Sequence, residues 1–411
     1  MKHLIFAAAL GLSAVTVLGQ GSIRRSQING ADINTITTAV PFLTINPDSK
    51  GGAMGDVGVS SSPDALSTFW NPSKLAFAES DFGASLSYVP WLRTIVPDMS
   101  LSYLSMYSKI NANSAVGGSF RYFNMGSITF TDENATTIRD FTPAEFALDL
   151  NYSIKLSERF ATGVALRYIN SNLTGGTVVQ GAATKAGNAV AFDLSAYYRS
   201  KAFKLGGKNS QFTGGLTISN VGTKMNYSTS AEPNFLPTML RLGPGLQVDL
   251  DEYQRVSLFI DITKLLVPTP PIYALDSNGA VVVDADGQKQ IESGKNPEVT
   301  VTQGIFQSFN DAPGGFAEEL REYNLSVGAE YLYNKQFAVR TGYFFEHPTK
   351  GNRQFISMGA GLKYSVLDID LSYLIPTSTV GNSPLGNTLR ITLKVGLTKS
   401  SKSEPATDVK G

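Results

Sequence analysis

The sequence predicts an all-β protein, a closed transmembrane barrel of fourteen antiparallel strands with a plug formed by its N-terminal segment. Two observations lead to this fold. After residue 81, apolar and polar residues alternate in about fourteen successive segments, and the connections between these segments alternate between short and long. Beyond the N-terminus there is also no long apolar run of the kind that forms a membrane-spanning helix.

Residues 146–156, FALDLNYSIKL, show the alternation in its simplest form. A period of two residues gives a strand one apolar face and one polar face. In a soluble sandwich the apolar face is buried, whereas in an outer-membrane barrel it faces lipid and the polar face lines the lumen. Segments such as RFATGVALRYI, AVAFDLSAYYR and RVSLFIDITK repeat the pattern at the length that a tilted strand needs to cross a bilayer.

The connections favour the membrane barrel over a sandwich or a propeller. Five of the short ones read INAN, LSER, DEYQ, YNKQ and YSV, and the sixth, SKAFKLGGKNS at 200–210, is longer. The connections between them are long: 123–143, 170–188, 221–237, 265–322, 347–353 and 375–387. Outer-membrane barrels keep their short turns in the periplasm, so an even strand number places both chain termini there.

The chain divides into four predicted parts. Lys2 and the apolar run from Leu4 to Leu18 are typical of a secretory signal peptide. In the segment after it, we expect two short helices, one capped by Ser62 and the other by Asn71, each with proline in the first position. The parts are a signal peptide at 1–19, a hatch at 20–80, a barrel at 81–398 with its long extracellular loop at 265–322, and a polar periplasmic tail at 399–411.

Composition excludes several classes of site. The 411 residues are formally neutral and contain no cysteine, which gives no support for nucleic-acid binding and rules out lipoproteins, disulfide scaffolds and thiolate metal sites. A Ser/His/Asp hydrolase would have to use His347, the only histidine outside the signal peptide. Asp284 and Asp286 lack the later ligands of an EF-hand, so we expect a β-turn there. We therefore predict no enzyme activity, no metal and no cofactor.

The stretch GGAMGDVGVSSSPDALSTFWNPSKLAFA resembles the N-terminal signature of FadL-type outer-membrane proteins, whose hatch carries an Asn-Pro-Ala-Gly-Leu-like motif. Here Ser73 and Lys74 stand in place of alanine and glycine. More narrowly, the letters from NTITTAVPFLTINPDSKGGAMGD to TFWNPSKLAF resemble the PorV family of the type IX secretion system in Bacteroidetes. Related families such as PorQ share much of this signature. The motif residues are Trp70, Asn71, Pro72 and Ser73.

This resemblance implies an integral outer-membrane protein that acts as a carrier. PorV-like proteins dock on the SprA translocon barrel, receive cargo through its C-terminal signal domain, and deliver it to a surface attachment complex of PorU with PorZ. Outer-membrane lipid is the remaining expected partner. The alternative is a FadL-like transporter of hydrophobic small molecules, which a continuous apolar pocket occupied by lipid or detergent would favour.

Two sets of residues are candidates for function. The loop 265–322 holds apolar groups that either bind a partner or cargo or else pack on the loop itself. Charges on the polar strand faces either pair with one another and with the plug or line a substrate path. The loop candidates are Pro268, Pro270, Pro271, Ile272, Tyr273, Ile305, Phe306, Phe309 and Phe316, and the lumen candidates are Asp149, Arg167, Asp193, Arg340 and Arg390.

Overall fold

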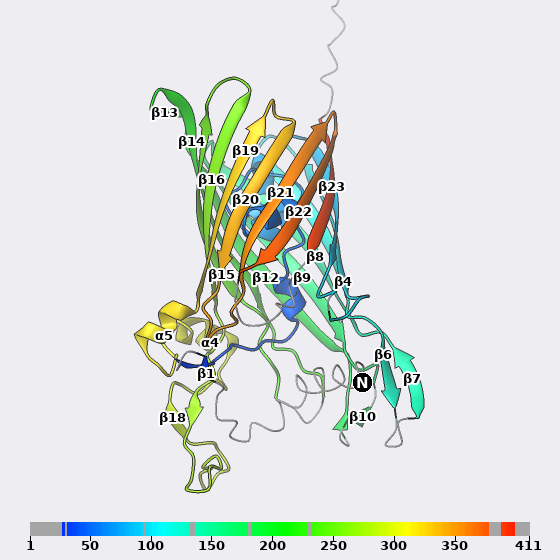
Figure 1. The fold of residues 1–411 in the computed structure, drawn as a ribbon, viewed down its shortest axis with the longest axis vertical. Helices are drawn as coiled ribbons and strands as arrows, with labels where there is room; N and C mark the ends of the chain where they lie inside the picture. Colours follow the sequence, from blue (N-terminus) through cyan, green and yellow to red (C-terminus); the bar gives the residue numbers. More distant parts are fainter. Residues whose placement is uncertain are drawn as a thin grey trace, which may run out of the picture.

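In the computed structural model the chain forms a closed barrel with its N-terminal segment inside (Figure 1). The predicted signal peptide and polar tail lie outside the residues that the structure describes. These are 27–28, 31–93, 95–131, 136–176, 178–179, 182–228, 232–377 and 388–398.

Fourteen strands form the wall, as predicted. Each is antiparallel to the next, and β23 pairs with β3, with Leu393 opposite Leu86, to close the barrel. The wall strands are β3 (Phe82–Pro90), β4 (Ser100–Lys109), β5 (Ser114–Asn124), β8 (Ala144–Ser157), β9 (Phe160–Asn172), β12 (Gly187–Arg199), β14 (Lys208–Gly222), β15 (Met239–Asp249), β16 (Gln254–Leu265), β19 (Tyr323–Tyr333), β20 (Phe337–Phe345), β21 (Gln354–Tyr364), β22 (Leu367–Pro376) and β23 (Leu389–Leu397).

The apolar faces of the strands point outward. On β8, Leu148 and Leu150 are 50% and 65% exposed, while Asp149 between them is 1% exposed. The same alternation runs through the other wall strands. The surface of the barrel is therefore an apolar belt and its lumen is polar, which is the arrangement of a membrane-spanning barrel.

All the short connections lie at one end of the barrel, here called the turn end, and the long ones at the other, the loop end (Figure 1). The longest connection at the turn end folds as a hairpin, in which β13 (Phe203–Leu205) pairs with β14 around Gly206 and Gly207. Both glycines have positive φ, as a two-residue hairpin turn requires.

The loops contain short elements that the alternation did not predict. They include two short helices in the longest loop, of seven and six residues. The loop elements are β6 (Ile128–Thr131), β7 (Thr137–Phe141), β10 (Val178–Val179), β11 (Ala182–Ala183), β17 (Ile272–Tyr273), β18 (Ile291–Ser293), α4 (Val301–Gln307) and α5 (Phe316–Arg321).

The hatch occupies the lumen, and most of residues 39–78 are buried there. Its backbone touches the wall directly, since a Cβ on Gly342 would lie 2.0 Å from the carbonyl carbon of Met54. No helix in the described part of the chain is long and apolar enough to cross a bilayer. The N-terminal elements are β1 (Gln27–Ile28), β2 (Ala31–Asp32), η1 (Pro41–Thr44), α2 (Ser49–Ala53), α3 (Ser67–Trp70) and η2 (Pro72–Phe77).

One of the two predicted helix caps is correct. Asn71 caps η2, its side chain accepting from the backbone N–H of Ser73, although the helix is of the 3-10 type. The predicted cap at Ser62 is wrong, because α3 begins only at Ser67. The hydroxyl and carbonyl oxygens of Ser62 both accept from Lys50 Nζ, at 2.6 and 3.2 Å, so Ser62 holds a neighbouring hatch segment instead.

Candidate functional site

Trp70, the first residue of the predicted hatch motif, joins different segments of the hatch to one another. Trp70 is 3% exposed and donates from Nε1 to Asp48 Oδ2 at 2.9 Å. Its ring covers Gly58 so closely that a Cβ there would lie 2.1 Å from the indole. Asp48 in turn caps α2, accepting from two of its backbone N–H groups. Trp70 thus holds three hatch segments together.

The remaining motif residues fasten the hatch to the wall. Asn71 donates from Nδ2 to the carbonyl of Ala196 on β12 at 3.0 Å. The backbone N–H of Ser73 donates to Ser195 Oγ on the same strand at 3.1 Å. Pro72 occupies the first position of η2, where its missing N–H costs no helical hydrogen bond. These contacts give the motif a structural role in docking the hatch.

Three of the five lumen candidates form one network. Arg167 on β9 donates from Nε to Asp149 Oδ1 at 2.6 Å and from Nη2 to Asp193 Oδ2 at 3.1 Å. The three residues are 1 to 3% exposed and lie on adjacent strands. Arg167 also donates to the side chain of Asn220, where β14 takes a positive φ beside a register shift. This network holds an irregular part of the wall.

The other two lumen candidates lie in separate ion pairs. Arg340 bridges Glu330 at 2.7 Å and Asp370 at 2.6 Å, all on the wall. Arg390 pairs with Asp56 of the hatch at 3.0 Å. The lumen charges are therefore paired with each other and with the hatch. Their acidic partners could not be chosen from the sequence, because pairing depends on strand register.

The proline-rich half of the loop candidates is not an open surface. Pro268 and Pro271 are buried, and Pro270, Ile272 and Tyr273 are half-buried. Thr269, between these prolines, donates from its backbone N–H to Asp311 Oδ2 at 3.1 Å. This stretch packs inside the loop.

The helical half of the loop is different, because its apolar side chains face outward. On α5, Phe316 and Leu320 are 78% and 55% exposed, whereas Glu319 and the following Glu322 are 5% and 6% exposed. A helix on a water-facing surface normally has the opposite arrangement. Both carboxylates bind Lys264 Nζ at the end of β16, at 3.3 and 2.6 Å. Glu319 and Glu322 are thus turned inward, while Phe316 and Leu320 face outward.

Helix α4 adds to this surface. Phe306 is 74% exposed and Phe309, just after the helix, is 44% exposed, while Ile305 is half-buried. We call Phe306, Phe309, Phe316 and Leu320 the aromatic surface; α4 and α5 lie beside the loop end of the barrel (Figure 1). Leu320 is absent from the sequence-based candidates. A capping box of Thr300 and Gln303 starts α4, and this signal could have located the helix.

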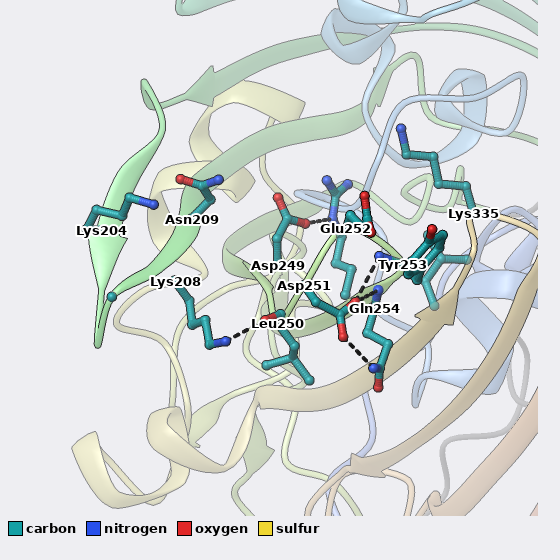
Figure 2. Close-up of a pocket in the computed structure, with 13 residues that line it drawn as sticks. Lys204, Lys208, Asn209, Asp249, Leu250, Asp251, Glu252, Tyr253, Gln254 and Lys335 are labelled. Carbon is teal, nitrogen blue, oxygen red and sulfur yellow. Dashed lines mark hydrogen bonds and ion pairs between the residues drawn. The ribbon is translucent and has the colours of Figure 1, made fainter.

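A cleft at the turn end of about 430 Å³ is lined by the β13–β14 hairpin and the turns after β15 and β19 (Figure 2). Two of its charged groups, Lys208 and Asp251, serve the local structure. Lys208 donates to the carbonyl of Leu250 at 2.6 Å, and Asp251 accepts from the backbone N–H groups of Tyr253 and Gln254. These contacts fix the turns.

The weighed catalytic and metal candidates have simple local roles. His347 Nδ1 lies 2.9 Å from Thr349 Oγ1, and burial, with Arg321 and Lys350 nearby, lowers the pKa of this imidazole. Asp284 closes a turn, accepting from the backbone N–H of Gly287. Within the described ranges, no three His, Cys, Asp or Glu side chains gather as a metal site.

A closed fourteen-strand barrel with an apolar belt and a segment packed in its lumen belongs to the class of outer-membrane barrels. Comparison with known families narrows this class. The family described as "Type IX secretion system protein PorV" matches residues 28–272. The chain belongs to this family, which implies a role in type IX secretion.

Solved structures with similar folds are distant. The Pseudomonas putida toluene transporter TodX is 11% identical, with a TM-score of 0.44, covering 85% of this chain and 98% of its own. The Ralstonia pickettii toluene transporter TbuX is 11% identical, with a TM-score of 0.43, and covers 86% and 98%. A Pseudomonas aeruginosa FadL homologue is 10% identical, with a TM-score of 0.42, and covers 89% and 99%. No curated protein matches the chain.

Proposed function

We propose that this protein is an outer-membrane carrier of the type IX secretion system. It takes cargo that bears a C-terminal signal domain from a SprA-type translocon barrel to a PorU/PorZ-type attachment complex. The turn end faces the periplasm and the loop end faces the cell exterior, as the lengths of the connections support. Membership of the PorV family supports the secretion role.

The aromatic surface is the single observation that carries the proposal. Two phenylalanines more than 70% exposed, Phe306 on α4 and Phe316 on α5, are costly in water. Exposed apolar patches of this kind mark contact sites for other proteins, and aromatic residues dominate the binding energy of such sites. The surface lies at the loop end, where a partner at the cell exterior would approach.

The contacts of the hatch support a carrier over a conduit. The hatch is tied to the wall by Arg390 with Asp56, and by Asp261, whose Oδ2 accepts from the backbone N–H groups of Gly58 and Val59 at 2.7 and 3.0 Å. Moving the hatch would leave these charges unpaired at a cost of several kcal/mol. Cargo therefore binds at the loops and does not pass through the lumen.

The test combines native purification with variants of the aromatic surface. The protein, tagged at its C-terminus, is purified from its own membranes in mild detergent, and co-purifying proteins are identified by mass spectrometry. The variant Phe306→Ala/Phe316→Ala/Leu320→Ala is compared with Leu275→Ala, which removes an apolar side chain, 49% exposed, from another part of the same loop.

The proposal expects a very large barrel protein and secreted proteins sharing a C-terminal domain to co-purify. The triple variant loses them and the control keeps them. If the same proteins co-purify equally with both variants, the aromatic surface is not the contact site. A lone barrel carrying only lipid or fatty acid would overturn the carrier proposal and favour a FadL-like transporter.

A further inference from the structure

Helix α5 is joined to the hatch by a direct contact between their side chains. Asn34, at the start of the hatch, donates from Nδ2 to Glu318 Oε1 of α5 at 2.9 Å. The same amide donates to the carbonyl of Pro270 at 3.2 Å, and the backbone N–H of Asn34 donates to the carbonyl of Thr349 at 3.0 Å. Asn34 is 5% exposed. It therefore binds the long loop, the loop after β20 and the hatch together.

Ion pairs on the inner side of α5 strengthen this junction. Lys350 Nζ binds Glu318 Oε1 at 2.7 Å and Glu322 Oε1 at 2.9 Å. Lys264 binds Glu322 and Glu319 from the barrel side. These side chains are 1 to 13% exposed, so each charge depends on its partners for compensation. Displacement of α5 would break several contacts at once, which is the behaviour of an element with two discrete states.

Displacement of α5 would also affect the part of the hatch that follows Asn34. The next fixed point is Ala39, whose backbone N–H donates to the carbonyl of Phe235 at 2.8 Å. Residues 35–38 between these two points are exposed or half-buried. Leu43 then accepts from Arg121 Nη1 of the wall at 2.7 Å. If Asn34 lost its contacts, the hatch would be freed from Asn34 as far as Ala39; we call this stretch the hatch entry. The contact of Leu43 with the wall would stay in place.

We propose that α5 couples the aromatic surface to the hatch. A partner that binds Phe316 and Leu320 and draws α5 outward separates Glu318 from Asn34 and loosens the hatch entry. Coupling between two sites is reciprocal. Loosening the hatch entry therefore also weakens the contacts that keep α5 in place. The nature of the partner rests on the proposed function, whereas the coupling is a property of the isolated chain.

Hydrogen exchange, followed by mass spectrometry on the purified protein in detergent, tests the coupling. Asn34→Ala removes only the hatch side of the contact, and Glu318→Ala removes the α5 side. Glu318→Gln keeps an acceptor for Asn34 and removes the charge opposite Lys350. Glu292→Ala is the matched control, because it removes an exposed carboxylate from the same loop.

Loss of a charge-assisted hydrogen bond raises local opening by about tenfold or more. Asn34→Ala is expected to raise exchange in α5 by this factor, and Glu318→Ala to raise it equally in residues 34–39. Glu318→Gln raises exchange at the hatch less than Glu318→Ala does, and Glu292→Ala changes neither segment. Changes confined to the mutated side would overturn the coupling. Because no partner is present, this result is independent of whether the carrier proposal holds.

Discussion

The buried charge network around Arg167 allows a quantitative prediction. Arg167→Met removes the cation from between Asp149 and Asp193, which it contacts through four hydrogen bonds of 2.6 to 3.3 Å. Because both carboxylates are at most 2% exposed, they stay buried without a counter-charge. Breaking a buried pair from one side costs about 3–5 kcal/mol. Urea unfolding in detergent should show a loss of this size in the free energy of unfolding.

A surface pair in the same protein is the control. Arg255 and Asp249 have the same shortest N–O distance, 2.6 Å, but their side chains are 39% and 37% exposed. Arg255→Met should cost less than about 1 kcal/mol. Adding Asp149→Asn and Asp193→Asn to Arg167→Met should recover part of the loss. If the Arg167 and Arg255 variants are equally stable, the reasoning from burial is refuted.

Three further predictions concern the belt, the hatch and the long loop. Leu150→Arg puts a charge on the outward face of β8 and should lower the free energy of unfolding in lipid by about 2–4 kcal/mol. Leu156→Arg, near the turn end, should lower it by only about 0–1 kcal/mol. Equal losses for the two variants, measured by unfolding in vesicles, would contradict the apolar belt. Gly58→Ala should drive a Cβ into Trp70, cost about 1–3 kcal/mol, and change the tryptophan emission; an unchanged spectrum would contradict that packing. Burial, with two neighbouring glutamates, raises the pKa of Asp311 from 3.8 to about 6, so the folded loop binds a proton that the unfolded chain releases, and this stabilisation is lost as pH rises through 6. Asp311→Asn should therefore increase the protection of the loop from hydrogen exchange at pH 7.5, and increase it less at pH 5, where part of the proton is still bound in the folded loop; equal effects at both values would contradict the assignment.

The wall was predictable because each strand carries its own pattern. In 146–156 every second side chain is apolar, and this local alternation decides which face meets lipid whatever the neighbouring strand is. The cap at Asn71 was predictable for the same reason, since the residue and the proline after it act within one turn. The cap at Ser62 failed because a distant residue, Lys50, uses its oxygen atoms.

The partners of the charged residues could not be predicted from the sequence. Arg340 pairs with carboxylates of the wall, whereas Arg390 pairs with a carboxylate of the hatch. Which carboxylate each one meets depends on strand register and on the path of the hatch, and neither is encoded locally. The inward-facing glutamates of α5 were missed for a related reason, since Lys264 and Lys350 reach them from other parts of the chain.

The barrel and α5 share one inversion of the usual polarity. In the wall, Leu150 faces out and Asp149 faces in, because the medium outside is apolar. Helix α5 has the same arrangement, with Phe316 outside and Glu319 inside, but it lies in a loop at the end of the barrel. Exposed apolar groups of this kind mark contact sites, and a partner at this surface belongs to the carrier function proposed above. The buried ion pairs with Lys264 and Lys350 hold the helix against the barrel.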